Sequence, residues 1–386
     1  MTATGITGVL GGAWRADVSG WGSVAPWDGS APLDWHVAAD DRWHSPAAET
    51  AVRQHRSAGA PVFETRLRVP GGDAVHRVWS VAGDGGWTVI EVVNDSPLPF
   101  ACAFTRGDVV TSRPPADVQI EGIDLAPGSI VLPVGHRANV TVGLPHAGAA
   151  GRTLPDPFES ADAVARGWVA VAGRGSRLVL PDRGLVDAVV AARCDLLLAG
   201  PPRSDEDPAG FLLAVGELVR LGELDREGAA ALGADVAAAA GQVARRDGWD
   251  ADAALAAAAL VLHRAGERRA VADVTRIVDH RATGSPPAAP VGGSRAVALT
   301  ERQLARGPVL FPDGIPAGWR GAEIEAHGLV VGPATTLSFA VRWHGEHPAV
   351  LWELTGDPVE LRAPAVDPAW RTTAPSGETL WRAGAS

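Results

Sequence analysis

One short segment of the chain places two carboxylates beside an indole ring: Arg246-Asp247-Gly248-Trp249-Asp250. It falls between two predicted helices. Asp250 could act as a general acid or base with Asp247 as the second carboxylate, and Trp249 could form a wall for a sugar ring. Glycoside hydrolysis uses two carboxylates roughly 5 to 9.5 Å apart. The alternative is that Asp250 caps the next helix and Trp249 packs against it.

Tryptophan is concentrated at the two ends of the chain. Seven of the 14 lie before residue 90 and five after residue 318. A rigid indole ring is a good platform for the apolar face of a sugar. Besides Trp249, the candidates are Trp168, if its helix faces the same rim, and the tryptophans of predicted loops: Trp21, Trp27, Trp35 and Trp43. The alternative is that these rings fill two β-rich cores in a chain without tyrosine.

Two polar clusters could bind a ligand, the first a cation or a sugar and the second a metal ion. The first would share one face of a strand, and the second crowds one turn: Glu323, Glu325 and His327, then His344, Glu346 and His347. Each has a simpler interpretation, as a solvated face or a wet loop, because three ligands on a tight turn rarely converge on one ion. We therefore expect no metal and no cofactor.

The composition excludes several chemistries. All 34 basic residues are arginine, so a Schiff-base lysine and a P-loop lysine are impossible. The net charge of −11 argues against nucleic acid or an anionic membrane as the main partner. Cys102 and Cys194 have no metal-ligand or CxxC spacing, which indicates buried free thiols. The abundance of Ala, Gly, Pro and Arg is typical of a high-GC bacterial genome.

The first 150 residues show the alternation of a β-rich domain. Phe63, Leu67 and Val69 alternate with polar residues, and turn residues follow at 70–73. Further strands are predicted at 75–81, 87–93, 100–104, 118–123, 129–134 and 138–144. Many short strands joined by turn residues predict an antiparallel β-sandwich.

Helical periodicity begins near Leu154. Asp156-Pro157-Phe158-Glu159 predicts a helix start with Asp as N-cap, and that helix would run to about Val171. Asp207-Pro208 predicts another start. The remaining helices are predicted from Leu185 and at 226–245, 251–264 and 269–281. About six helices joined by short loops, within residues 155–282, should pack as antiparallel neighbours.

A Pro/Gly/Ser-rich segment at 283–294 predicts a linker to a C-terminal β module at 295–386. In that module Leu337–Trp343 alternates with period two. Residues 344–348 form a turn, and Ala349–Leu354 follows, which predicts a β-hairpin.

This order resembles that of bacterial glycoside hydrolases with a β-sandwich and a helical toroid, such as the glucoamylase, trehalase and rhamnosidase groups. The residues that carry the resemblance are Val89–Phe100, Val179–Asp182, Leu337–Gly345 and Pro348–Glu353. The resemblance covers most of the chain, and it lies in the order of the predicted elements and in general sequence character, without a specific motif. The chain has about half the helices of a complete toroid, which implies an open half-ring or a lost catalytic function.

The sequence therefore predicts a multidomain α+β protein: an N-terminal antiparallel β-sandwich (1–150), a central α-helical half-toroid (155–282) and a small C-terminal β module. The resemblance implies a carbohydrate-active, glycoside-hydrolase-like protein that acts on or binds an oligosaccharide. The alternative is a non-catalytic scaffold or partner-binding protein that uses the helical groove. Carboxylates converging in an aromatic-lined pocket would favour the enzyme, and an apolar groove without them would favour the scaffold. Without a predicted signal peptide or membrane span, we expect a cytoplasmic location.

Overall fold

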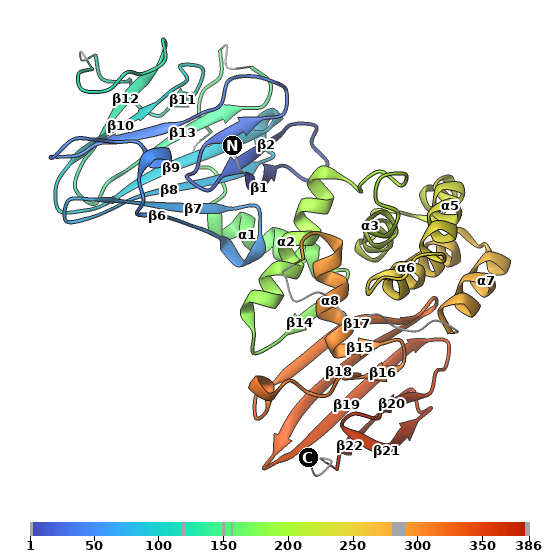
Figure 1. Ribbon diagram of the computed structural model, residues 1–386. Coiled ribbons are helices and arrows are strands. Elements are labelled where there is room, and N and C mark those ends of the chain that lie inside the picture. Colours follow the sequence, from blue (N-terminus) through green and yellow to red (C-terminus); the bar gives the residue numbers. More distant parts are fainter. Residues whose placement is uncertain (1–2, 118–119, 149–150, 156, 280–290, 383–386) are drawn as a thin grey trace. The chain divides into compact units, whose positions relative to one another are not determined.

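The computed structural model describes residues 3–117, 120–148, 151–155, 157–279 and 291–382 (Figure 1). Over these residues the protein is a mixed α+β chain with several antiparallel sheets and eight α-helices. It divides into two compact units, Met1–Trp168 and Val169–Ser386. None of the described helices has the length and apolar character needed to cross a membrane.

The first unit contains three sheets, with strand orders β1-β2-β3, β12-β10-β4-β5 and β11-β13-β9-β8-β7-β6. Adjacent strands are antiparallel in all three. The strands are β1 (Ala3–Gly8), β2 (Arg15–Ser19), β3 (Val24–Pro26), β4 (Trp35–Ala38), β5 (Trp43–His44), β6 (Val52–Arg56), β7 (Phe63–Val69), β8 (Gly72–Val81), β9 (Trp87–Asp95), β10 (Phe100–Phe104), β11 (Val110–Thr111), β12 (Ile130–Val134) and β13 (Asn139–Pro145). Short 3-10 turns lie at 46–48, 57–59 and 83–85.

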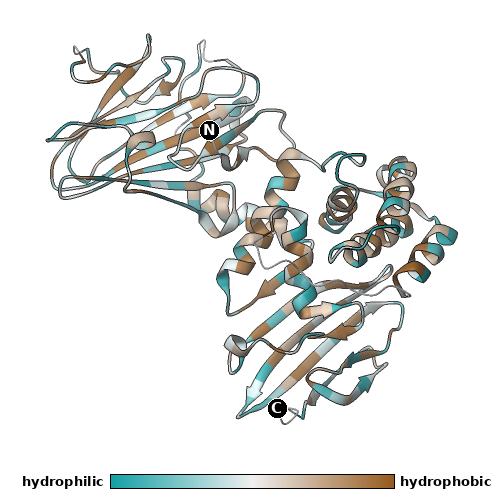
Figure 2. Cartoon of the chain, viewed as in Figure 1, coloured by the Kyte–Doolittle hydropathy of each residue, from teal (hydrophilic) through white to brown (hydrophobic). Residues whose placement is uncertain are grey.

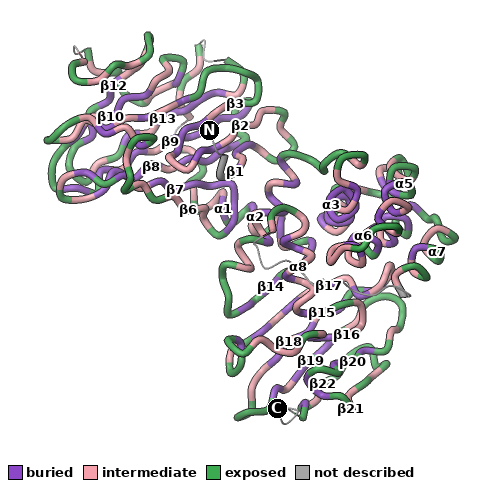
Figure 3. Tube along the Cα trace, viewed as in Figure 1, coloured by how far each residue is buried: buried purple, intermediate pink, exposed green. Residues whose placement is uncertain are grey.

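Most of the strands predicted in this unit are confirmed. The predictions at 63–69, 75–81, 87–93, 100–104, 129–134 and 138–144 coincide with or overlap β7, β8, β9, β10, β12 and β13. The strand predicted at 118–123 is wrong over 120–123, which are not extended in a ladder, and residues 118 and 119 lie outside the described residues. The alternation works because inward-facing side chains, such as Phe63, Leu67 and Ile90, join one apolar core. Figure 3 shows that much of β8 and β9 is buried.

The first helix starts later than predicted. α1 (Ala161–Ala172) begins after Ser160, whose hydroxyl accepts a hydrogen bond from the amide of Ala163 (3.2 Å). Pro157 and Phe158 are therefore not helical, and Asp156 lies outside the described residues. The carbonyl of Glu159 instead accepts a hydrogen bond from the indole of Trp79 at 2.9 Å. A serine cap four residues further on replaces the predicted Asp-Pro start.

The second unit begins with a run of helices. They are α2 (Arg183–Ala199), α3 (Pro208–Leu221), α4 (Arg226–Ala231), α5 (Gly233–Val243), α6 (Ala251–Ala265), α7 (Arg268–Asp279) and α8 (Ser294–Leu304). Asp182 and Asp207 cap α2 and α3 through their carboxylates, and Pro208 occupies the first turn of α3. The helix predicted at 226–245 is broken at Leu232 into α4 and α5. Apolar residues of α3 to α7 share one core, and Figure 2 shows both apolar and polar stretches along these helices.

Two further sheets complete the second unit, with strand orders β14-β17-β18-β19-β22 and β15-β16-β20-β21. The strands are β14 (Arg177–Val179), β15 (Ala305–Arg306), β16 (Val309–Leu310), β17 (Ile324–Gly332), β18 (Thr335–His344), β19 (His347–Gly356), β20 (Leu361–Ala363), β21 (Asp367–Thr372) and β22 (Ser376–Leu380), and a 3-10 turn lies at 317–319. β16 and β20 are parallel. The predicted hairpin is confirmed as β18 and β19, paired from Thr335↔Gly356 to His344↔His347.

Helices and terminal strands share one core in this unit. Val189 of α2 and Val297 of α8 join the same apolar cluster as Leu337 and Phe339 of β18. β14, which precedes α2, pairs with β17 far along the chain. α8 lies where the sequence predicted the start of a β module. Within the predicted linker, residues 283–290 lie outside the described residues. The domain boundaries drawn from the sequence stay predictions.

Candidate functional site

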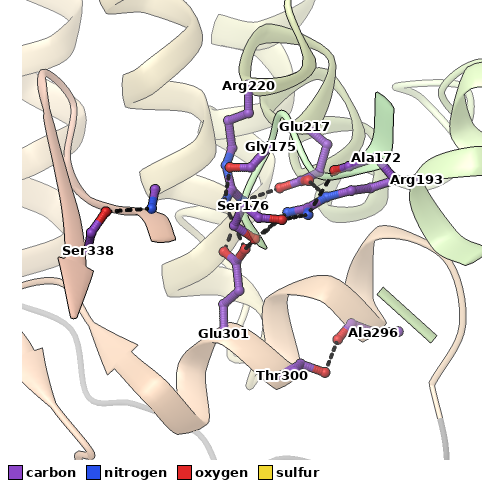
Figure 4. Close-up of polar contacts among 11 residues, drawn as sticks. Ala172, Gly175, Ser176, Arg193, Glu217, Arg220, Ala296, Thr300, Glu301 and Ser338 are labelled. Carbon is purple, nitrogen blue, oxygen red and sulfur yellow. Dashed lines mark hydrogen bonds and ion pairs between the residues drawn. The ribbon is translucent and has the colours of Figure 1, made fainter. Parts of the chain in front are cut away.

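Four charged side chains meet in the interior of the second unit. Arg193 comes from α2, Glu217 and Arg220 from α3, and Glu301 from α8 (Figure 4). Their side chains are only 1, 8, 9 and 15% exposed, respectively. We call these four residues the ion cluster.

Arg193 is the most deeply buried member and uses all three of its guanidinium nitrogens. Its Nε donates to Glu217 Oε2 at 2.7 Å, and its Nη2 donates to Glu301 Oε1 at 3.1 Å. Its Nη1 donates to the carbonyls of Ser176 (2.8 Å) and Ala172 (3.2 Å). The planar fork of arginine suits such multiple bonding, so Arg193 joins α2 to the segment before β14.

Arg220 closes the ion cluster from the other side. It donates to both carboxylate oxygens of Glu301, at 2.9 and 2.7 Å, and also to Glu217 and to the carbonyl of Gly175. The hydroxyl of Ser176 donates a further bond of 2.6 Å to Glu301. With two arginines and two glutamates the charges balance, which is the condition under which buried ions are tolerated.

These contacts favour the ionised form of Glu301. Burial by itself would raise the pKa of Glu301, but the charges of Arg220 and Arg193 outweigh it and hold that pKa below its usual range. For Arg220 the directions are reversed: burial alone would lower its pKa, but the charges of Glu217 and Glu301 raise it. A general acid needs a carboxyl group that keeps its proton near neutral pH. Glu301 is held in the opposite state.

A groove of about 290 Å³ borders the ion cluster. Its walls come from α3, α6, α7 and α8 and from residues 305–308 and 329–333, and we call it the helical groove. Most of its surface is aliphatic, with Leu213, Ala256, Leu260, Leu329 and Val331 among the contributing side chains. Among the described residues that line it, none is aromatic.

Small residues on two helices allow the groove to form. A Cβ added at Gly216 of α3 would lie 2.7 Å from the Cβ of Ala257 on α6, so these helices approach closely at that point. Ala256 of α6 is exposed and lines the helical groove. Glu217, Arg220 and Glu301 line one side of the helical groove. The result is a mostly apolar space with a charged but electrically balanced border.

Asp250, the leading catalytic candidate, lies elsewhere in this unit and is bound to an arginine. Its Oδ2 accepts a hydrogen bond of 2.6 Å from Nε of Arg295. The same guanidinium also donates two hydrogen bonds to Asp207, of 2.6 and 2.7 Å. Asp250 occupies the N-cap position of α6, but its side chain makes no cap hydrogen bond. The predicted capping role is therefore replaced by an ion pair that ties the starts of α3, α6 and α8 together.

The other residues of the predicted sugar site are spread over the chain. Asp247 is exposed, and Trp249 is half-buried with its carbonyl accepting a hydrogen bond from Arg302 at 3.3 Å. Trp168 is buried at the end of the first unit, whereas Trp249 belongs to the second. Trp249 and Asp250 adjoin one another only as sequence neighbours at the start of α6.

Two candidate tryptophans of the first unit differ in accessibility. Trp35 is only 2% exposed, stacks on His76 with ring centroids 4.5 Å apart, and donates its indole N–H to the carbonyl of Trp21. Its ring face is therefore covered, as the core interpretation expects. Trp43 is half-buried and donates to the carbonyl of Glu121 at 2.8 Å.

The polar cluster around β17 is tied together by an arginine. Arg342 contacts Glu323 and donates to Glu325 at 2.6 Å, while His327 lies 3.2 Å from Glu325. The two glutamates therefore already have a cationic partner. Over the described residues, no group of three His, Cys, Asp or Glu side chains is arranged to hold a metal ion.

Sequence reasoning missed the ion cluster. Its one local signal is the pair Glu217 and Arg220, three residues apart in a helix that is otherwise mostly apolar and buried. Arg193 and Glu301 are 108 positions apart, so their meeting depends on how α2 and α8 pack. Comparison of the chain with protein family models, with curated proteins and with solved structures finds no match.

Proposed function

We propose that the protein is a non-catalytic binding protein whose second unit takes up a small, mostly apolar molecule in the helical groove. The observation that carries this proposal is the groove itself: about 290 Å³, close to the lower limit for small-molecule sites, with aliphatic walls and a few polar groups on one side. The charges of its lining balance, which favours an uncharged ligand over an ion, because three carboxylates accompany three arginines: Glu217, Asp252, Glu301, Arg220, Arg302 and Arg306.

The state of the carboxylates supports binding over hydrolysis. Asp250 and Asp207 share Arg295, and Glu217 and Glu301 share Arg193 and Arg220. Each of these carboxylates is therefore engaged by a guanidinium, and for Asp207 and Glu301 this contact lowers the pKa. A glycosidase requires at least one carboxyl group that is protonated and free to approach the leaving group.

The finer architecture belongs to the same proposal. We infer a β-sandwich in the first unit, because Phe63 and Leu67 of the six-stranded sheet share one core with Trp35 and Phe104 of the four-stranded sheet. We infer a half-toroid in the second unit from the succession of short-looped helices α2 to α7, in which α3, α5 and α6 share one apolar core. A half-ring of this kind would leave the helical groove open on one side.

An uncharged fluorescent probe tests the groove. N-phenyl-1-naphthylamine should bind with a rise in emission, because the groove removes it from water. Ala256→Leu should weaken that binding about tenfold, because the larger side chain takes space in the groove that the ligand would fill. About two ligand carbons would then stay in water, and burying each of them contributes about 0.8 kcal/mol. Ala238→Leu, at an exposed alanine of α5, is the matched control and should leave binding unchanged. Equal binding to both variants, or none to the wild type, would refute the proposal.

Carbohydrate binding is the second candidate, and it rests on Trp27 in the first unit. This side chain is 49% exposed, and its indole N–H donates to Asp17 Oδ1 at 3.0 Å. An exposed ring beside a carboxylate can stack on a sugar and bond to its hydroxyls. Calorimetric titration with a panel of oligosaccharides should then give heat that Trp27→Ala abolishes. Absence of heat with every sugar would remove this candidate.

A further inference from the structure

The small sheet near the C-terminus has the strand order β15-β16-β20-β21 (Figure 1). Its pairing aligns three arginines in one row across the four strands. Arg306 of β15 is paired with Val309 of β16, Val309 with Arg362 of β20, and Arg362 with Arg371 of β21. Residues directly opposite one another on adjacent strands point to the same face of a sheet. The row therefore places three guanidinium groups on one face.

These arginines differ from those of the ion cluster, because the described residues offer them no anionic partner. No carboxylate and no hydrogen-bond acceptor of the described chain contacts the side chain of Arg306, Arg362 or Arg371, and all three are exposed. Asp367, at the start of β21, turns its carboxylate to the amides of Ala369 and Arg382 instead. Three unpaired cations thus gather on a chain whose net charge is −11.

The arrangement has an electrostatic cost. Like charges directly opposite on neighbouring strands are destabilising, and Arg362 and Arg371 are such a pair. Strands lie about 4.8 Å apart, so these two backbones are close neighbours, while Arg306 lies two strands, roughly 10 Å, from Arg362. An anion between the guanidinium groups would remove the repulsion and supply the missing hydrogen-bond acceptors.

A pocket of about 280 Å³ lies at this row. Besides the three arginines it is lined by Val309, Trp370 and three prolines, and no acidic residue is among the lining. Trp370 is held edge-on against Trp352 and Trp381, with ring centroids 5.5 and 5.4 Å apart. Because Trp370 and Arg371 are consecutive in β21, this ring lies on the core side of the sheet, opposite to Arg371. On the arginine face the apolar wall comes from Val309 and the prolines, whose rings are rigid. We call this site the arginine pocket.

We propose that the arginine pocket binds an organic phosphate or sulfate ester: its oxyanion lies between Arg362 and Arg371, and its apolar body lies against Val309 and the prolines. Arginine binds tetrahedral oxyanions through paired N–H groups, which explains why two arginines stand together. Arg306 can reach a second oxyanion or the far edge of the ligand. The apolar wall of Val309 and the prolines explains why an ester with an apolar body fits better than a bare ion.

Calorimetric titration with phenyl phosphate and phenyl sulfate tests the site and distinguishes the two oxyanions. Arg362→Gln and Arg371→Gln should each weaken binding about tenfold to a hundredfold, the range expected for one lost charge-assisted interaction. Arg269→Gln, at an exposed arginine of α7, makes the same change in net charge and should have little effect. Arg306 also lines the helical groove, so it is left unchanged in this test.

Two further readouts separate a built pocket from general charge attraction. Inorganic phosphate should bind more weakly than phenyl phosphate, because it has no apolar body to contact Val309 and the prolines. Without ligand, Arg362→Gln should melt at the same temperature as the wild type or higher, since it relieves the repulsion with Arg371. Absence of binding with both esters, or an equal loss in Arg269→Gln, would overturn the proposal. The binding of the uncharged naphthylamine probe to the helical groove should not change in Arg371→Gln.

Discussion

Arg220 of α3 and Glu301 of α8 form a two-bond ion pair, Nη1 to Oε2 at 2.9 Å and Nη2 to Oε1 at 2.7 Å, with both side chains largely buried. The pair ties the helical run to the helix that leads into the terminal strands. A buried pair gains little over an apolar substitute, because both ions lose their hydration. Removing only one partner destabilises the fold strongly, since it leaves an uncompensated charge inside the protein.

Glu301→Gln should therefore destabilise the second unit strongly. It removes one of the two negative charges that balance Arg193 and Arg220, and breaking such a buried pair costs about 3 to 5 kcal/mol. Urea unfolding followed by circular dichroism measures the loss. Glu267→Gln, at an exposed glutamate before α7, is the control and should change the free energy of unfolding by less than about 0.5 kcal/mol. Similar values for both variants would contradict the structural role of the ion cluster.

The same carboxylate predicts a pH dependence. The pKa of Glu301 is lowered in the folded state, so its contribution to stability is complete above the ordinary glutamate pKa and is lost as the pH falls through the lower, folded pKa. The difference in unfolding free energy between wild type and Glu301→Gln should shrink between pH 6 and pH 3. A constant difference over this range would show that Glu301 does not titrate as an ion in the folded protein.

Asp250→Asn separates the structural from the catalytic interpretation of this residue. In the structure Asp250 bonds to Arg295, and its side chain makes no helix cap, so the variant should lose about 1 kcal/mol of stability or less. Arg295→Gln should cost more, because Arg295 also holds Asp207, whose pKa its guanidinium keeps below the usual range. Asp205→Asn, in an exposed pair with Arg203, is the control. A loss of hydrolytic turnover without a loss of stability would restore the catalytic hypothesis.

The sequence was most informative where local patterns decide the structure. The hairpin of β18 and β19 was predicted because alternating residues flank a turn at Gly345, which adopts φ +63°. The starts of α2 and α3 were predicted because Asp182 and Asp207 satisfy amides within the first turn. α8 was missed because it follows a Pro/Gly-rich segment and has only 11 residues.

The sites could not be predicted for the opposite reason, since they depend on long-range packing. The arginine pocket requires the parallel pairing of β16 with β20, which brings Val309 beside Arg362 across more than 50 positions of sequence. The ion cluster requires three helices to meet. The candidates chosen from sequence were neighbours in the chain, such as Trp249 and Asp250, whereas the charged residues that converge lie far apart in it.

His76 should make the first unit less stable in acid. Burial lowers the pKa of His76 to about 3, against about 6.5 for an unfolded histidine. Between these pH values the unfolded chain binds a proton that the folded chain does not. The free energy of unfolding therefore falls by about 1.4 kcal/mol for each unit by which the pH is lowered. His76→Gln has no such proton to bind. At pH 7 this variant should be less stable than the wild type, because it loses the stack on Trp35, and this difference in unfolding free energy should be smaller at pH 4. The control, His344→Gln at an exposed position, should have the same stability as the wild type at both pH values.

Gly22 and Gly29 form a matched pair that distinguishes backbone strain from steric conflict. Both have positive φ, +87° and +81°, where an alanine costs about 1 to 2 kcal/mol. A Cβ at Gly29 meets no atom within 4 Å, but a Cβ at Gly22 would lie 2.9 Å from His76 Nδ1, 3.0 Å from Thr65 Oγ1 and 3.1 Å from Trp35 Nε1. Gly22→Ala should therefore cost about 1 to 3 kcal/mol more than Gly29→Ala, because buried side chains must shift to admit the methyl group. Urea unfolding followed by tryptophan fluorescence measures both, and equal losses would mean that the Trp35–His76 stack yields without cost.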